Sequence, residues 1–262
     1  MHTFYTTIPE QTHSWRTFDT NSASKNVSTP VRGDNDFRPV FFQLSAVSNA
    51  RGSSYLEWGG NKILCSVFGP RENTLRRDEF SIKGRLVCEV SICPFSIPHT
   101  PNARQQSYID TDRLSALLVS SLESSVCIDK YPKSQIEICL LFIETDTLSM
   151  STAAVLSASL ALIDARIEVW DITIACSCMI RSENSVKMDP SWSEITDSEY
   201  VGLLTLFYQP SLNVVSGVEC EGELTNLQLV KGMDSCIEGC LQLKKYIEGK
   251  LKENILKSRA EK

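Results

Sequence analysis

The apolar positions in the first third of the chain fall into short runs. Four of these runs are rich in β-branched, aromatic and other apolar residues, which is typical of strands: Pro39–Val47, Ser54–Trp58, Lys62–Phe68 and Arg85–Cys93. Turn formers separate them, and Gly59-Gly60-Asn61 has the composition of a tight hairpin. The pattern predicts that the chain enters its domain as a β-meander.

Helical patterns begin after residue 110. Asp112–Val126 places its leucines on one face, and Asp110 or Thr111 can cap its first turn. Thr152–Ala165 is small and apolar nearly all round, which is typical of a buried helix. One strand, Gln135–Glu144, lies between the two helices. Because the buried helix separates two strands, the pattern predicts at least one β-α-β unit with a right-handed crossover.

Strands dominate again after the buried helix. We expect three of them, Asp171–Ile180, Tyr200–Tyr208 and Leu212–Glu219, with the last two forming a hairpin and Met188–Glu199 as a polar loop. A long helix closes the chain and opens with a possible capping box, Thr225-x-x-Gln228. Its apolar stripe consists of Leu229, Met233, Cys236, Ile237, Cys240, Leu243, Ile247, Leu251 and Ile255. This order of elements indicates a layered α+β or α/β domain.

The first 36 residues have a different texture. They hold eleven Ser and Thr, show no apolar periodicity and end in several turn formers. Such a segment cannot bury enough apolar surface to offset the entropy of ordering. We therefore predict a mobile tail over residues 1–36 and one domain over residues 37–262.

Composition narrows the class of protein. The 262 residues are 42% hydrophobic and 22% charged, with a formal net charge of −6, as in an ordinary globular protein. An acidic chain has no general affinity for nucleic acid, so any RNA contact needs a local basic patch or an assembly. Two long uncharged stretches, Thr147–Ile163 and Tyr200–Val218, are too polar for a bilayer core. Since no secretory signal is visible either, we expect an intracellular protein with no membrane contact.

The ten cysteines are accompanied by only three histidines and include no Cys-x-x-Cys pair. The closest spacings are Cys88-x4-Cys93, Cys176-x-Cys178 and Cys236-x3-Cys240, which match no common zinc framework. Most cysteines lie inside apolar segments, so we predict reduced, buried thiols, with a disulfide or a metal site as the alternatives. No metal and no cofactor are expected.

Side chains that could carry chemistry are few. Basic residues cluster at Arg71, Arg76 and Arg77, at Lys83 and Arg85, and at Arg104 and Arg113. They are typical of solvent-exposed loops. The alternative is that they contact the phosphates of RNA. Glu144 and Asp146 follow a strand just before the buried helix, either as an exposed strand end or as functional acids. No P-loop, nucleophile elbow or Ser/His/Asp set is visible.

Several segments resemble the ribonuclease PH family. Ala50–Arg71 is similar to its first hairpin, in which Ala-x-Gly-Ser leads through a glycine turn to Gly-Pro-Arg, and Lys83–Cys88 resembles its next strand. The helix from Asp112, the strand ending Glu144-Thr145-Asp146 and the helix over residues 153–165 resemble its central β-α-β unit. Within the family, Lys130–Glu137 and Met188-Asp189-Pro190 resemble a ring subunit of the eukaryotic RNA exosome. The resemblance runs from about Arg38 to Leu251.

This resemblance implies an α+β, RNase PH-like layered fold, of the ribosomal protein S5 domain 2-like type. It implies a structural subunit of the exosome ring that supports 3'-5' RNA processing and decay, including rRNA processing. The expected partners are other RNase PH-like ring subunits, S1/KH-type cap subunits and RNA in the channel, in the nucleus, nucleolus and cytoplasm. The basic residues that we expect to face RNA are Arg76, Arg77, Lys83, Arg85 and Arg104.

One departure from the family pattern bears on activity. Active members place an Asp-Gly-Gly-Thr-Arg-like turn before the buried helix, where backbone amides and an arginine hold the attacking phosphate. That turn falls on Thr147–Ser151, which has no glycine and no arginine. Asp146 lies one position from the turn's acid, and Asp189 matches another family acid. We therefore predict no catalytic residues. The alternatives are an active phosphate-dependent exoribonuclease whose site a neighbouring subunit completes, and a stand-alone binding domain.

Overall fold

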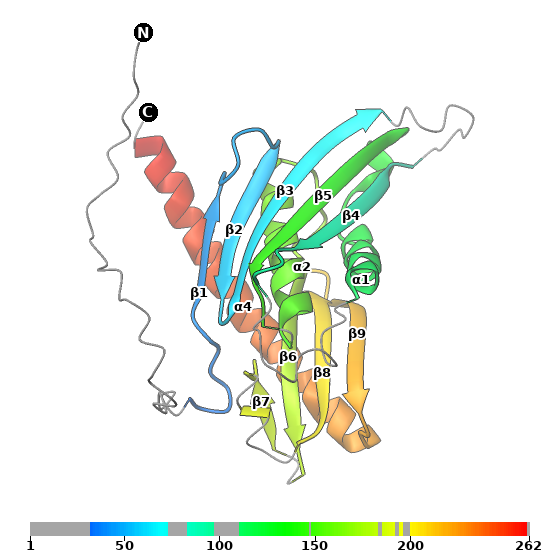
Figure 1. Ribbon diagram of the computed structural model, residues 1–262, viewed down its shortest axis with the longest axis vertical. Coiled ribbons are helices and arrows are strands. Elements are labelled where there is room, and N and C mark those ends of the chain that lie inside the picture. Colours follow the sequence, from blue (N-terminus) through cyan, green and yellow to red (C-terminus); the bar gives the residue numbers. More distant parts are fainter. Residues whose placement is uncertain are drawn as a thin grey trace. The chain divides into compact units, whose positions relative to one another are not determined.

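A computed structural model describes residues 32–72, 83–96, 110–146, 148–182, 185–191, 194–195 and 200–260. Asp34–Lys262 form one compact unit, built from two β-sheets and three α-helices over the described residues (Figure 1). Most of the predicted tail, residues 1–31, lies outside the described residues. The α+β fold expected from the sequence is confirmed.

The first sheet has five strands in the order β1-β2-β3-β5-β4. Its strands are β1 (Val40–Leu44), β2 (Gly52–Trp58), β3 (Asn61–Glu72), β5 (Ser134–Glu144) and β4 (Arg85–Ile92). β1 to β3 form the predicted antiparallel meander, and two residues, Gly59 and Gly60, make the predicted tight turn. The meander prediction is wrong for β4, because β5 pairs with β3 and separates it from β4.

The β-α-β unit exists, but around a different helix from the predicted one. β4 and β5 are parallel, and α1 (Thr111–Glu123) lies between them in the chain, capped by Asp110 as expected. The buried helix α2 (Met150–Asp164) instead connects β5 to the second sheet. It packs against β2 and β3 on one side and β6 on the other. Its apolar pattern therefore indicated correctly that the helix is buried, but not which strands it connects.

The second sheet is antiparallel and has the order β7-β6-β8-β9. Its strands are β7 (Val186–Met188), β6 (Ile174–Arg181), β8 (Tyr200–Gln209) and β9 (Val214–Gly222). The hairpin of β8 and β9 was predicted. The short strand β7 was missed because three residues are too few to show a period, and Met188 had been assigned to the polar loop Met188–Glu199.

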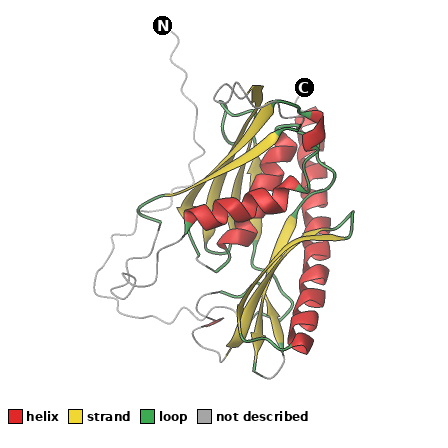
Figure 2. Cartoon of the chain, turned by 90° about the vertical axis from the view of Figure 1, so that its right-hand side faces the viewer, coloured by secondary structure: helices red, strands yellow, loops and turns green. Residues whose placement is uncertain are grey.

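The last helix, α4 (Asn226–Ala260), lies along the second sheet (Figure 2). The capping box is present: the Thr225 amide donates to Gln228 Oε1 over 3.0 Å, and the Gln228 amide donates to Thr225 Oγ1 over 3.4 Å. The middle of the predicted stripe is buried, and Tyr246 donates a 2.8 Å hydrogen bond to the Val40 carbonyl of β1. None of the helices in the described ranges is both long and apolar enough to cross a membrane.

The ten cysteines are free thiols, and their predicted burial is confirmed for seven of them. Cys93 and Cys139 are half-buried, and only Cys220 on β9 is exposed. Six of the buried thiols fill core positions as small apolar side chains, in both sheets and in α4, and Cys127 is buried just before a short 3-10 helix.

α2 packs so closely on β2 that a side chain is excluded at Gly52. A Cβ there would lie 2.0 Å from the Ala165 amide nitrogen and 2.7 Å from the Ala161 carbonyl oxygen. We expect Gly52→Ala to lower the free energy of unfolding by about 3 kcal/mol or more, because backbone must move to admit the methyl group. Gly249→Ala, on an open face of α4 with nothing within 4 Å, should raise it by about 1 kcal/mol. Denaturant unfolding measures both, and equal effects would contradict the packing.

Candidate functional site

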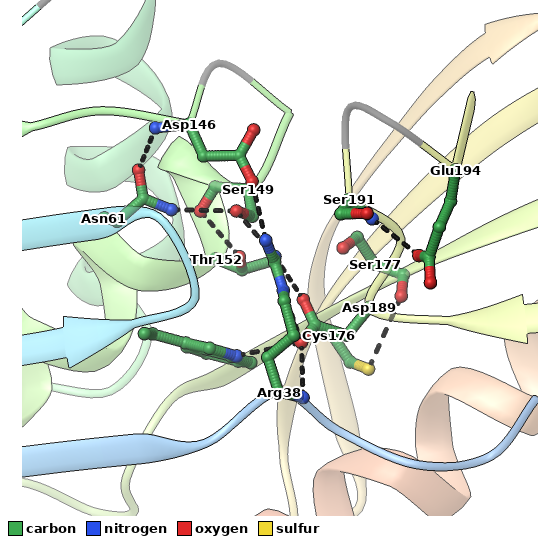
Figure 3. A network of polar contacts seen from close by, with 11 residues as sticks. Arg38, Asn61, Asp146, Ser149, Thr152, Cys176, Ser177, Asp189, Ser191 and Glu194 are labelled. Carbon is green, nitrogen blue, oxygen red and sulfur yellow. Dashed lines mark hydrogen bonds and ion pairs between the residues drawn. The ribbon is translucent and has the colours of Figure 1, made fainter. Parts of the chain in front are cut away.

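Asp189 is one of the two acids that the family resemblance points to. Its carboxylate is bound by Arg38, which lies 151 residues earlier in the chain (Figure 3). Its Oδ2 accepts hydrogen bonds from the Arg38 amide and Nε, both 2.9 Å long, and its Oδ1 accepts one from Arg38 Nη2 over 2.5 Å. Trp58 Nε1 donates a fourth hydrogen bond, of 3.1 Å, to Oδ2. Asp189 is 1% exposed, so its lone pairs are used within the chain.

The second acid, Asp146, pairs with the same guanidinium. Arg38 Nη1 lies 2.6 Å from Asp146 Oδ2, and Arg38 Nη2 donates a 2.8 Å hydrogen bond to Ser149 Oγ. Asn61, fully buried in the first hairpin, donates to Ser149 Oγ over 2.8 Å and accepts from the Asp146 amide over 2.7 Å. One arginine thus pairs with both acids, and one asparagine holds the Asp146 amide and the Ser149 hydroxyl in place.

Each of these residues stands at an element end. Arg38 precedes β1, Asp146 follows β5, Ser149 is the N-cap of α2 and Asp189 follows β7. As an N-cap, Ser149 makes no side-chain capping bond, because its hydroxyl is turned to Arg38 and Asn61. The backbone of Asp189 has φ of +46°, a conformation that costs a non-glycine residue energy and that four hydrogen bonds to its carboxylate offset. We call Arg38, Asp146, Asp189, Ser149 and Asn61 the arginine lock.

Burial and charge act in opposite directions on Arg38. Burial alone would lower the pKa of its guanidinium, but the hydrogen bonds and charges of Asp189 and Asp146 outweigh it, so the pKa lies above its ordinary value. The side chain is 10% exposed, and those of its two partners are 12% and 1% exposed. The Arg38 guanidinium therefore stays protonated at physiological pH.

A cleft of about 250 Å³ opens beside the lock, at the start of α2. Leu148, Met150 and Ser151 line it where the phosphate-binding turn of active family members would lie. Its other lining residues come from α1 and its N-cap, from the second sheet and from the segment after β7: Asp110, Arg113, Leu114, Ser177, Pro190, Leu203, Thr205, Glu219 and Glu221. Three carboxylates face one arginine, and Arg113 is already 3.3 Å from Glu219. The cleft is therefore acidic and disfavours an anion.

The sequence named some of these residues and missed others. Asp146 and Asp189 were expected as family acids, and the structure brings them to one guanidinium. Glu144 lies outside the lock and pairs with Lys62 at the surface, 2.9 Å away. Arg38 and Asn61 were missed. Thr147 lies outside the described residues, and the remaining turn positions hold no glycine or arginine.

The basic residues predicted to face RNA lie far from the cleft where they are described. Lys83 and Arg85 are exposed at the start of β4, and Lys83 lies 3.3 Å from Asp129. Arg85 is paired in register with Gln135, at the opposite end of β5 from the acid site, which at about 3.3 Å per residue means on the order of 30 Å. Arg76, Arg77 and Arg104 fall outside the described residues.

The comparison with known proteins agrees with the fold and with the family resemblance of the sequence. Residues 36–168 match the 3' exoribonuclease family, domain 1, and the chain belongs to this family, the RNase PH family. Exosome complex component MTR3 of Mus musculus is 30% identical over 217 residues, covering 77% of each protein. Exosome complex component RRP41-like of Arabidopsis thaliana is 30% identical over 227 residues, covering 85% of this chain and 83% of that protein. Rice (Oryza sativa) Rrp46 has the same fold, with a TM-score of 0.71 at 17% identity over 84% of this chain and 98% of that one.

Proposed function

We propose that the chain is a non-catalytic subunit of the RNA exosome core ring, of the MTR3 type (exosome component 6). It supports 3'-5' RNA processing and decay by holding the ring together and by forming part of the RNA channel. The arginine lock is the observation that carries this proposal. The two acids that the family resemblance points to are already paired with Arg38 within the chain, beside an acidic cleft.

The chemistry of phosphorolysis explains why the lock matters. The reaction needs a bound phosphate and positive or hydrogen-bonding groups at the oxygen that leaves the RNA chain. The described part of the turn, residues 148–151, offers no glycine for a close backbone approach and no arginine to pair with phosphate. The carboxylate oxygens of Asp146 and Asp189 already accept hydrogen bonds from Arg38, so they are held away from a substrate or a metal ion. A site of this kind favours a structural role for the chain over phosphorolysis.

The same proposal assigns the partners and the location. Other RNase PH-like subunits flank the chain in the ring, S1/KH-type subunits cap it, and RNA passes through the channel. The chain works in the nucleus, nucleolus and cytoplasm, where the exosome acts. The exosome components among its relatives support this assignment.

Assembly is the first test of this proposal. We expect the purified chain to bind other RNase PH-like exosome subunits from the same organism and to enter a ring of defined stoichiometry. Size-exclusion chromatography with light scattering, on the chain alone and mixed with each recombinant subunit, measures this. A monomer that captures none of them would contradict the ring assignment.

RNA contact is the second test, and it concerns Lys83 and Arg85 together with Arg76, Arg77 and Arg104. We expect changing these residues to Glu to weaken RNA protection by the assembled ring and to lower the salt slope of binding by about 1 for each phosphate that is no longer bound. Lys250→Glu on α4, an exposed lysine paired with Glu253, is the matched control and should change nothing. An unchanged footprint would assign the five residues to ordinary solvated loops.

A further inference from the structure

The two faces of the second sheet have different surroundings. α4 packs against one face, where Cys178 donates to the Gly232 carbonyl and a Cβ at Gly232 would lie 3.0 Å from Leu204 (Figure 2). Since side chains alternate along a strand, the neighbouring residues Ser177 on β6 and Thr205 on β8 point to the opposite face. That face forms one wall of the cleft at the start of α2.

The strand register aligns oxygen-bearing side chains across this wall. Ser177 is paired with Thr205, and Thr205 is paired in turn with Glu219 on β9. Residues directly opposite each other in an antiparallel pair have Cβ atoms about 5 Å apart. Two residues further along β9, Glu221 is paired with Leu203. The wall therefore carries two hydroxyls and a carboxylate in one row, with a second carboxylate beside it.

The two hydroxyls of this row are buried and lack hydrogen-bond partners. Ser177 is 5% exposed and Thr205 is 8% exposed, and neither side chain makes a hydrogen bond within the described part of the chain. Native structures rarely leave a buried polar group unpaired unless water or a ligand completes it. Hydroxyl oxygens accept as well as donate, whereas carboxylates only accept. A ligand that satisfies the whole row therefore brings hydrogen-bond donors.

The charge of the cleft selects a cation. Asp110, Glu219 and Glu221 face Arg113, and three carboxylates against one arginine leave an excess of two negative charges. Arg113 is 3.3 Å from Glu219, while Glu221 makes no ion pair within the described ranges. The amino end of α2 adds only about half an elementary positive charge, which does not reverse this balance. A ligand with more than one positive charge fits best.

The rest of the lining is apolar and suits a hydrocarbon chain. Leu114 of α1, Met150 of α2 and Pro190 are buried side chains at the cleft. Methylene groups pack on such surfaces while the charged ends of the same molecule reach polar partners. The cleft therefore combines donor-accepting oxygens, excess negative charge and apolar surface within about 250 Å³.

We propose that the cleft binds a linear aliphatic polyamine, a methylene chain with ammonium groups along it. One ammonium group donates to Ser177, Thr205 and Glu219, and a second reaches Glu221. Glu219 and Glu221 are two residues apart on β9, or about 7 Å, a span that about four methylenes between two nitrogens cover. The inference rests on the proposed function only in that the same cleft takes up no phosphate.

Isothermal titration calorimetry of the intact chain with spermidine tests the site. We expect saturable binding at one site, weakened by salt. Hexaamminecobalt(III) has the same charge as spermidine but no methylenes, and should bind about 10-fold more weakly or worse. No spermidine binding, or equal affinity for both cations, would overturn the proposal and leave the proposed function standing. Inorganic phosphate should not bind; phosphate binding that spermidine displaces would contradict both.

Three single variants locate the contacts. Thr205→Val keeps the branched shape but removes the hydroxyl, and should weaken spermidine binding about 5-fold. Glu221→Gln should weaken it about 3-fold. Glu123→Gln, the matched control, removes the same charge from an exposed residue at the other end of α1 and should leave the affinity within about 1.5-fold. Circular dichroism confirms that each variant is folded. Wild-type affinity in Thr205→Val, or equal losses in Glu221→Gln and Glu123→Gln, would overturn the proposal.

Discussion

Replacing Arg38 with methionine is expected to lower the free energy of unfolding by about 3 to 5 kcal/mol. Methionine keeps much of the side-chain volume but removes the positive charge that Asp146 and Asp189 share in a buried site. Taking a charge out of water is costly, and the ion pairs with Arg38 offset most of that cost here. Chemical denaturation of the wild type and of Arg38→Met, at the same pH and salt, measures the loss.

A surface ion pair near the same end of β5 gives the matched control. Lys62 and Glu144 are 2.9 Å apart, but their side chains are 38% and 55% exposed. Lys62→Met should therefore cost no more than about 1 kcal/mol. Adding Asp189→Asn to Arg38→Met should recover part of the lost stability, since one buried charge is then removed. An Arg38→Met loss no larger than that of Lys62→Met would contradict the account of the arginine lock.

The strands were predictable because their signals are local. Alternating and β-branched runs placed all strands except β7, and the Gly59-Gly60 turn fixed the first hairpin. The helix caps at Asp110 and Thr225 were also predictable from the sequence, because a capping side chain accepts a hydrogen bond from an amide two or three residues away.

The sheet order was not predictable from local signals. β5 enters between β3 and β4 because it can pair with both, antiparallel on one side and parallel on the other, and no run of residues in either strand encodes that choice. The all-round apolar pattern of α2 likewise says only that it is buried, not that it joins two sheets.

The candidate site was predictable only in part, for a related reason. The resemblance pointed to Asp146 and Asp189, but nothing near either residue in the sequence indicates that Arg38 would pair with both. Arg38 is 108 residues from Asp146 and 151 from Asp189 along the chain. The lone signal was an arginine directly before a strand, at the point where the domain begins. The pairing of both acids with Arg38 is visible only in the folded structure.

Catalytic silence is the second large prediction. The chain alone, given RNA and inorganic phosphate, should release no nucleoside diphosphates, because each missing transition-state donor costs on the order of 100-fold or more in rate. In the described part of the turn, both the glycine approach and the arginine are absent. Asp146→Asn keeps an oxygen for Arg38 and should leave RNA decay by the whole assembly unchanged, since the proposed function assigns catalysis to other subunits.

The direct measurement is nucleoside diphosphate release by the assembled ring, with and without phosphate, for wild type and Asp146→Asn. A phosphorolytically active member of the family serves as the positive control, and light scattering confirms that the variant enters the ring. The account predicts that release per ring is the same for both forms and that the chain alone gives none. Phosphate-dependent release that disappears in Asp146→Asn would contradict it, and would show instead a working exoribonuclease site that a neighbouring subunit completes.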